Sequence, residues 1–167
     1  MIITGTIHKF GDDVNTDEII PARYLNTSDA KELAEHVMED ADPQFPGKVK
    51  PGDIIVAGKN FGCGSSREQA VTCLKAAGVA AIVAKSFARI YFRNAINLGL
   101  PIVQCAEAVD AIHAGDRIAI DLAAGTLRHS ERAYSFAPLP PEVAEILEAG
   151  GLVAYVRRRK ATPANTD

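Results

Sequence analysis

Three short apolar segments, alternating with two longer amphipathic ones, limit what this chain can fold into more than any other feature of its sequence. Residues 53–58, 80–84 and 102–105 are short, apolar and bounded by turn-forming or polar residues, so they are predicted to be buried strands. Residues 66–77 and 86–98 lie between them and are predicted to be helices, each followed by a glycine that can end it. Because this order of elements requires right-handed crossovers, the three strands are predicted to form a parallel sheet.

The flanking segments extend this core into a single α/β domain with a central, partly parallel sheet flanked by helices. Residues 2–10 are predicted to be an opening strand, and three short segments near the C-terminus a β-meander. Asp29 and Ser86 are expected to cap helices, because short polar side chains can accept a hydrogen bond from a first turn. The remaining predicted elements are a helix over 30–38, a helix over 106–113, meander strands at 117–122, 126–129 and 133–136, and a helix from Pro140 to Gly150. We expect one domain over residues 1–160 and a disordered tail at residues 161–167.

Composition and charge exclude several classes of function. With 167 residues, 47% hydrophobic and 23% charged, the chain has the composition of a globular domain with a sizeable core. The net charge of −3 argues against a general nucleic-acid-binding protein, and the basic run at 157–160 is interpreted as a solvated end or an oligomer contact. No apolar stretch approaches the roughly 20 residues of a membrane span, and the N-terminus lacks the features of a signal peptide. We expect a cytoplasmic protein that binds neither nucleic acid nor a membrane.

The cysteines and histidines do not predict a metal site in this chain. Cys63, Cys73 and Cys105 are odd in number, and no pair has the C-x-x-C spacing typical of metal ligands. The four histidines are scattered and also lack metal-ligand spacing. We therefore expect reduced, structural thiols and no metal ligands.

Residues 60–69, Asn-Phe-Gly-Cys-Gly-Ser-Ser-Arg-Glu-Gln, carry the strongest chemical signal. Gly62 and Gly64 permit a positive φ and a close backbone approach directly after a predicted strand. The turn leads into a predicted helix, whose N-terminus attracts anions. The known phosphate and hydrolase motifs do not fit, because Arg67 stands where the third glycine of G-x-G-x-x-G belongs, and neither G-K-[ST] nor G-x-S-x-G is present. The turn is predicted to bind a carboxylate or phosphate.

The two serines and the arginine of this turn suggest two kinds of chemistry. Ser65 with Glu68, and Ser66 with Gln69, each has the spacing of a capping box, so one serine can cap the helix while the other keeps a free hydroxyl. The alkoxide of such a hydroxyl could accept a proton if backbone donors and a nearby cation stabilised it. Arg67 can bind a carboxylate through two parallel hydrogen bonds. A well-capped helix with Arg67 in a structural ion pair fits the pattern equally well.

Three blocks of sequence resemble a known family. They are DVNTDEIIPARYL at 13–25, NFGCGSSREQA at 60–70 and AKSFARIYFRNAINLGLP at 84–101. The chain resembles the 3-isopropylmalate dehydratase small subunits, which are related to the swivel domain of aconitase, and the likeness runs from about residue 2 to residue 159. The resemblance implies a swivelling β/β/α domain and a hydro-lyase that moves a hydroxyl between adjacent carbons by dehydration and rehydration, as in leucine biosynthesis.

The resemblance also implies a division of labour between two chains. A [4Fe–4S] cluster is expected in a separate large subunit, while the small subunit closes over it and supplies the base. By the family motif, Ser65 is that base, and Ser66 and Arg67, beside Gly64, bind a carboxylate of a small hydroxy di- or tricarboxylic acid. Thr16 and Asp17 match a Thr-Asp pair at the edge of the active site, where Asp17 is expected to act in catalysis by orienting a neighbouring side chain.

Residues 24–28 match the loop that selects the substrate in this family. Its members here are Tyr24, Leu25, Asn26, Thr27 and Ser28. The resemblance implies an arginine at position 26 in homoaconitase-like enzymes and an apolar residue in isopropylmalate enzymes, and Asn26 is neither. We expect the enzyme to act on 2-isopropylmalate. The alternative enzymes are 2,3-dimethylmalate dehydratase and homoaconitase. A stand-alone carboxylate-binding regulatory module is the alternative outside the enzymes.

The chain departs from the family pattern once more, and two arginines are left without an assigned role. Gln69 stands where the family commonly has a histidine, which is expected to change the chemistry little because glutamine can still cap. Arg89 and Arg93 lie four residues apart on one predicted helix face. They could add positive charge near the site, bridge to carboxylates, or contact the partner subunit.

Overall fold

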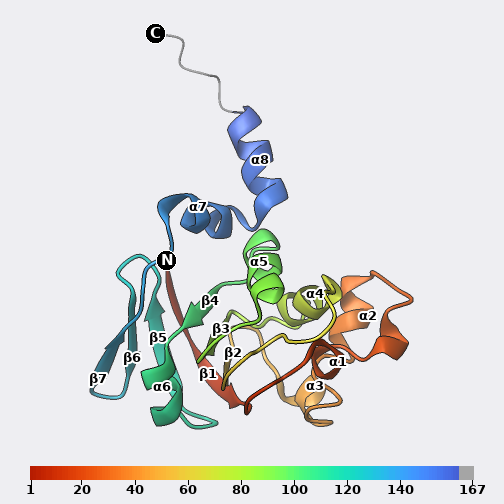
Figure 1. Ribbon diagram of the computed structural model, residues 1–167, viewed down its shortest axis with the longest axis horizontal. Coiled ribbons are helices and arrows are strands. Elements are labelled where there is room, and N and C mark those ends of the chain that lie inside the picture. Colours follow the sequence, from red (N-terminus) through yellow and green to blue (C-terminus); the bar gives the residue numbers. More distant parts are fainter. Residues whose placement is uncertain (162–167) are drawn as a thin grey trace.

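The computed structural model describes residues 1–161, and a mixed sheet forms the centre of its fold (Figure 1). In this part of the chain the strands follow the order β4-β3-β2-β1-β5-β6-β7. They are β1 (Ile2–Lys9), β2 (Ile54–Ala57), β3 (Ala81–Ala84), β4 (Ile102–Gln104), β5 (Arg117–Asp121), β6 (Thr126–His129) and β7 (Arg132–Ser135). β1 to β4 run parallel, whereas β5, β6 and β7 are each antiparallel to the strand before them in the sheet. The predicted parallel sheet and C-terminal β-meander are confirmed.

The helices connect the parallel strands much as the sequence predicts. α4 (Gln69–Ala76) joins β2 to β3, and α5 (Arg89–Asn97) joins β3 to β4. Asp29 caps α2 as expected, because its carboxylate accepts a hydrogen bond from the Lys31 backbone N–H at 2.9 Å. The other helices are α1 (Thr16–Ile19), η1 (Ala22–Tyr24), α2 (Ala30–Ala34), α3 (Phe45–Lys48), α6 (Ala106–Ala111), α7 (Pro141–Ala149) and α8 (Leu152–Ala161). α2 is shorter than predicted, and neither α1 nor α8 was expected.

The central parallel strands β2 and β3 are buried on both faces. Ile55 and Ile82 belong to a core shared with α2, α4 and α5, whereas the adjacent Ile54 and Val83 belong to a second core enclosed by β5, β6, β7 and α6. Side chains alternate between the two faces of a strand, so a strand covered on both faces has no polar positions. Every residue of β2 and β3 is buried. The carboxyl ends of these strands are therefore firmly held, and the loops that lead to α4 and α5 start from them.

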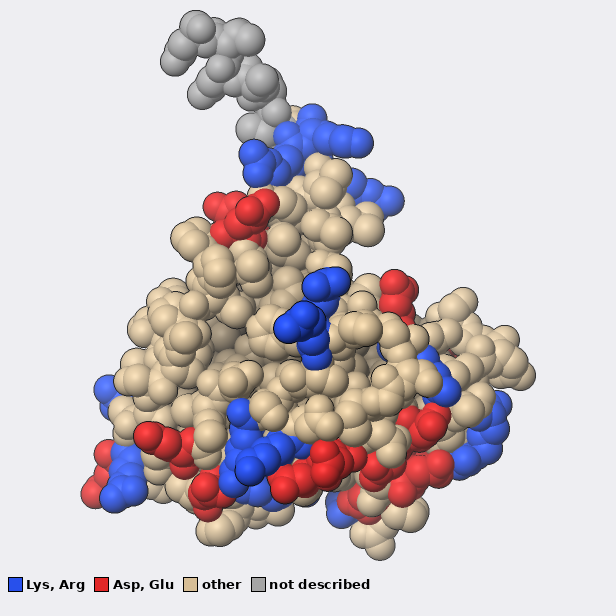
Figure 2. Space-filling model, viewed as in Figure 1, with Lys and Arg blue, Asp and Glu red and all other residues tan. Residues whose placement is uncertain are grey.

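The C-terminal helix α8 projects beyond α5 and α7 (Figure 1). It follows Gly150 and Gly151, which separate it from α7, and it carries the basic residues 157–160, all of them exposed. Figure 2 shows basic side chains gathered at this end of the molecule. Ala161, predicted to begin the tail, is the last residue of α8, and the rest of the predicted disordered tail, 162–167, lies outside the described residues. Within residues 1–161, no helix has the length and apolar character needed to cross a membrane.

Candidate active site

The candidate site lies where the chain leaves the carboxyl ends of β1, β2 and β3. The three loops that follow stay joined by backbone hydrogen bonds. Gly62 N–H donates to the Val14 carbonyl at 2.8 Å, and Phe61 N–H donates to the Ser86 carbonyl at 3.1 Å. The carboxyl edge of a parallel sheet is where ligand-binding crevices form in open α/β folds. The geometry of this site is thus set by backbone contacts between three distant parts of the sequence.

The glycine turn adopts the conformations that its glycines permit. Gly62 has a φ of +84° and Gly64 a φ of +96°, a region that side chains of L-residues rarely enter. A Cβ on Gly62 would lie 2.1 Å from Cγ of Tyr91, so the turn packs directly on that buried ring. At Gly64 the nearest atom, Thr16 Oγ1, would be 3.4 Å away. The predicted positive φ is confirmed at both glycines, and a close backbone approach is present at Gly62.

The predicted capping of the helix by the serines is wrong. α4 begins at Gln69, its N-cap is Glu68, and no side chain among the described residues makes a capping bond there. Both predicted capping boxes are therefore absent from the described chain, because Ser65 and Ser66 lie before the N-cap residue Glu68. Ser66 Oγ instead lies 3.4 Å from Nδ2 of Asn94, which donates to it.

Ser86 is also not a helix cap. α5 begins at Arg89 with Ala88 as its N-cap, and no described side chain caps it. The Ser86 hydroxyl accepts a hydrogen bond from the Asn60 backbone N–H at 2.8 Å, so it fixes the start of the glycine turn.

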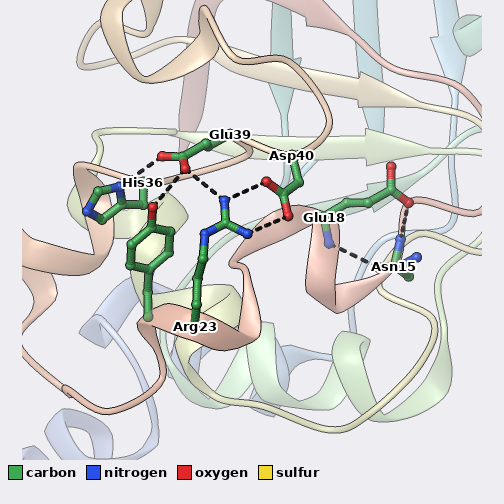
Figure 3. Close-up of polar contacts among 7 residues, drawn as sticks. Asn15, Glu18, Arg23, His36, Glu39 and Asp40 are labelled. Atoms are coloured by element: carbon green, nitrogen blue, oxygen red, sulfur yellow. Dashed lines mark hydrogen bonds and ion pairs between the residues drawn. The ribbon is translucent and has the colours of Figure 1, made fainter.

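Ser65 is held through its backbone, and its side chain is exposed. The buried Thr16 hydroxyl donates to the Ser65 carbonyl at 2.9 Å. The Ser65 hydroxyl has no hydrogen-bond partner among residues 1–161. Thr16 begins α1, which a capping box stabilises: Asn15 accepts from the Glu18 N–H at 2.9 Å, and Glu18 Oε1 accepts from the Asn15 N–H at 3.3 Å (Figure 3). The structure thus fixes the position of Ser65 and leaves its hydroxyl open to a ligand.

Arg67 forms an ion pair with Asp17, 50 positions earlier in the sequence. The Arg67 side chain is 21% exposed, while that of Asp17 is 63% exposed. The expectation that Asp17 orients a neighbouring side chain is consistent with this contact. Because the guanidinium has five N–H donors, it can hold a second carboxylate while it stays paired with Asp17.

A pocket of about 300 Å³ lies beside these residues. Its volume suits a small organic acid. Ser65 is not itself a lining residue, but its neighbours on both sides are. The lining residues are Thr16, Gly62, Gly64, Ser66, Arg67, Ala88, Arg89, Ile90, Tyr91 and Asn94. The structure therefore brings Thr16, Gly64, Ser66 and Arg67 together, as predicted.

The two arginines of α5 differ in position. Arg89 lines the pocket and is exposed, whereas Arg93 is exposed but lies outside the lining set. Neither forms an ion pair with another described residue, so they do not bridge to carboxylates within this part of the chain. Figure 2 shows basic side chains over α5 within a largely uncharged surface. Ile90, also on α5, is exposed. Arg89 thus adds an available positive charge to the pocket.

The predicted specificity loop lies around a different hollow. Tyr24, Asn26 and Thr27 line a depression of about 220 Å³ together with Glu32, Glu35 and His36. The two lining sets have no described residue in common. Within this chain, Asn26 is therefore not brought together with Ser65 and Arg67.

The described cysteines do not form a metal site. Cys73 and Cys105 are buried, and Cys63 is half-buried. Burial, followed by the charge of Asp13, raises the pKa of Cys63, which keeps that thiol neutral near pH 7. Within residues 1–161 no group of three or more cysteine, histidine or acidic side chains is placed to hold a metal ion, so these residues do not fit an iron–sulfur cluster.

Replacing Tyr91 with phenylalanine tests the support beneath the turn. The Tyr91 hydroxyl is buried and donates to the Ala70 carbonyl at 2.9 Å, linking α5 to α4. We expect Tyr91→Phe to lower the free energy of unfolding by about 1 kcal/mol, the net contribution of one hydrogen bond. Chemical denaturation measures this, with Tyr134→Phe as the control, because the buried Tyr134 hydroxyl has no hydrogen-bond partner among the described residues. A stability equal to that of the wild type would contradict the structural role of this bond.

Comparison with known proteins identifies the family. The aconitase C-terminal domain family matches residues 16–107, which include the glycine turn, the loop at 24–28 and α5. The 3-isopropylmalate dehydratase small subunit of Moorella thermoacetica is 59% identical over 164 residues, covering 97% of this chain and 99% of that protein. The chain belongs to the family of 3-isopropylmalate dehydratase small subunits. The small subunit of Thermodesulfovibrio yellowstonii is 56% identical over 161 residues, 95% of this chain and 96% of that protein.

A solved structure supports the same family. The crystal structure of 3-isopropylmalate dehydratase from Methanocaldococcus jannaschii superimposes with a TM-score of 0.91 at 52% identity, covering 96% of each chain. Within the 3-isopropylmalate dehydratase small-subunit family, the fold is that of the aconitase C-terminal, or swivel, domain. The predicted family and fold are confirmed.

Three contacts in this small-subunit fold were missed from sequence. Asn94, in the second turn of α5, donates a hydrogen bond to Ser66. The sequence indication for Asn94 was its position within the family-like block at 84–101. The capping box of Asn15 and Glu18 could have been recognised from its N-x-x-E spacing. The packing of Tyr91 on Gly62 leaves no local signal, because it depends on how α5 crosses the turn.

Proposed function

We propose that this chain is the small subunit of a hydro-lyase that converts 2-isopropylmalate into 3-isopropylmalate and is active only with a large subunit. The proposal is supported by the names and full-length similarity of the relatives. The observation that carries it is an exposed serine and a half-buried arginine beside one pocket, supported by loops from three strands. On this proposal the enzyme acts in leucine biosynthesis, in the cytoplasm.

Ser65 is the proposed base. A serine hydroxyl can remove a proton from carbon only as its alkoxide, so it needs a cation and hydrogen-bond donors nearby. Arg67 and Arg89 supply positive charge at the pocket. A [4Fe–4S] cluster, proposed to lie in the large subunit, would act there as a Lewis acid on the substrate hydroxyl.

Arg67 is the proposed clamp for a substrate carboxylate. Asp17 holds the guanidinium from one side, and Ser66 lines the same pocket. Thr16 and Gly64 line this pocket as well. A clamp of this kind aligns a carboxylate through two hydrogen bonds, which orients the rest of the acid toward Ser65.

We expect Arg67→Lys to raise the KM for 2-isopropylmalate by roughly 10- to 100-fold, because a single ammonium cannot reproduce the two-pronged contact. Asp17→Asn should raise KM by about tenfold, because it removes the partner that orients the guanidinium. Steady-state kinetics of the reconstituted complex measure both effects. Arg128→Lys, at an exposed position of β6, is the matched control. A wild-type KM in the Arg67 variant would exclude the clamp.

The function itself is tested by anaerobic reconstitution with the large subunit. Turnover of 2-isopropylmalate is compared with turnover of 2,3-dimethylmalate and homocitrate under the same conditions. We expect activity with 2-isopropylmalate and none with this chain alone. Turnover restricted to another acid would replace the substrate, whereas carboxylate binding by a chain that joins no partner would favour a regulatory module.

A further inference from the structure

One carboxylate organises the root of the predicted specificity loop. Glu39 Oε1 accepts hydrogen bonds from Nη2 of Arg23 and from the hydroxyl of Tyr24, both at 2.9 Å. Its other oxygen, Oε2, lies 2.8 Å from Nδ1 of His36 (Figure 3). These contacts lower the pKa of Glu39, the His36 hydrogen bond contributing most, so the carboxylate is charged at neutral pH. Both oxygens of Glu39 are thus committed to partners.

The ring of Tyr24 is fixed by its faces as well as by its hydroxyl. It stacks on the His36 ring with centroids 3.6 Å apart and an angle of 4° between the planes. The Arg23 guanidinium lies 4.9 Å from the Tyr24 ring centroid, and Asp40 holds the same guanidinium at 2.8 and 3.2 Å. Arg23 and Tyr24 are therefore held by three residues of one neighbouring segment.

That segment is anchored in the core. Met38 is fully buried, and its backbone N–H donates to the Ile19 carbonyl at 2.8 Å. Val37 is buried as well. Glu39 therefore connects the loop root to a rigid part of the molecule, and its contacts transfer that rigidity to Tyr24.

The loop is fixed at both ends and open between them. At its far end, Thr27 Oγ1 accepts from the Asp29 N–H at 3.0 Å, and Asp29 caps α2. Asn26 lies between these two fixed points and lines the hollow of about 220 Å³. The position of Asn26 is thus governed mainly by Tyr24 on one side and by Thr27 on the other.

We infer that Glu39 is a positioning residue for substrate selection: by holding Arg23 and Tyr24, it presents Asn26 and the loop at 24–28 to the substituent of the substrate that does not react. This inference rests on the proposed function, because it assumes that the loop meets a substrate. Glu39 does not line the pocket at Ser65, and the side chains that hydrogen-bond to it in the described structure do not line that pocket either. Its loss should therefore change how acids are discriminated more than it changes the chemical step.

The first experiment measures loop order in the full chain, without a partner or substrate. Amide hydrogen exchange of residues 22–28 is compared in the wild type, Glu39→Ala and Tyr24→Phe. We expect exchange at least tenfold faster in Glu39→Ala and several-fold faster in Tyr24→Phe, which keeps the stacked ring and loses only the hydroxyl. Asp42→Asn, which loses a surface ion pair with Lys48, is the control and should exchange as the wild type does.

The second experiment uses the reconstituted complex. We expect Glu39→Ala to raise the KM for 2-isopropylmalate by about tenfold, to leave kcat within about twofold, and to change the ratio of kcat/KM between 2-isopropylmalate and 2,3-dimethylmalate by at least fivefold. A merely structural role would lower the activity on both acids equally.

Two results would overturn the inference. One is unchanged exchange at 22–28 in both variants, and the other is an equal loss of activity on both acids. If the wild-type complex turns over neither acid, the proposed function fails, while the exchange experiment still decides whether Glu39 orders the loop.

Discussion

Ser65→Ala is expected to lower kcat of the reconstituted complex by about 10²- to 10⁴-fold, the range typical of a group that transfers a proton. KM should change little, because the proposed carboxylate clamp at Arg67 remains. The melting temperature should stay within about 1 °C of the wild type, because the Ser65 side chain is exposed and its backbone is held by Thr16. Steady-state kinetics and thermal denaturation together separate lost chemistry from lost structure.

The controls for Ser65→Ala are two other serines. Ser135→Ala, on exposed β7, should keep full activity. Ser66→Ala removes the contact with Asn94 and should act chiefly on KM. Full turnover by Ser65→Ala would exclude this serine as the base and leave the turn with a binding role alone.

Gly62→Ala is expected to destabilise the fold by about 3 kcal/mol or more, and it is the largest stability effect we predict. The new Cβ would lie 2.1 Å from Cγ and 2.4 Å from Cβ of Tyr91, so the ring or the turn must move. The positive φ of +84° adds strain of about 1 kcal/mol. Overpacking of a buried site typically costs 1–3 kcal/mol, so the two effects together exceed the usual loss for a point mutation.

Gly115→Ala separates these two effects. Gly115 has a similar φ of +87°, yet a Cβ there would meet no atom within 4 Å. We expect it to lose only about 1 kcal/mol, the contribution of the backbone strain. Urea denaturation compares the two variants directly. If Gly62→Ala were no less stable than Gly115→Ala, the close packing of the turn on Tyr91 would not contribute to stability.

The order of strands and helices could be predicted because each element carries its own pattern. Residues 54–57 and 81–84 are apolar at every position, which is typical of strands covered on both faces, and both are fully buried. Gly78 and Gly99 end the two crossover helices with positive φ, so the boundaries after α4 and α5 were also readable. These patterns are local, so they can be recognised without knowledge of tertiary contacts.

Long-range contacts explain what could not be predicted. Asp17 and Arg67 meet because the loops after β1 and β2 are joined by backbone hydrogen bonds, and nothing in either segment alone encodes that pairing. Thr16 also donates to the Cys63 and Ser65 carbonyls and so holds the turn against α1. Ser65 and Ser66 therefore lie before the N-cap residue of α4 and do not cap it, although their spacing allows capping. Tertiary contacts there override a local preference. α8 was missed because two glycines precede it and its last turns are strongly basic.

The pocket beside Ser65 and the depression at Asn26 have separate sets of lining residues. The pocket beside Ser65 is built from the loops after β1 and β2 and from α5, whereas the depression at Asn26 is built from the loop at 24–28 and α2. A mutation at Asn26 or Thr27 can therefore alter one surface without disturbing the backbone frame of the other. On the proposed function, substrate preference can therefore change through substitutions in one part of the fold while the residues proposed for proton transfer stay the same.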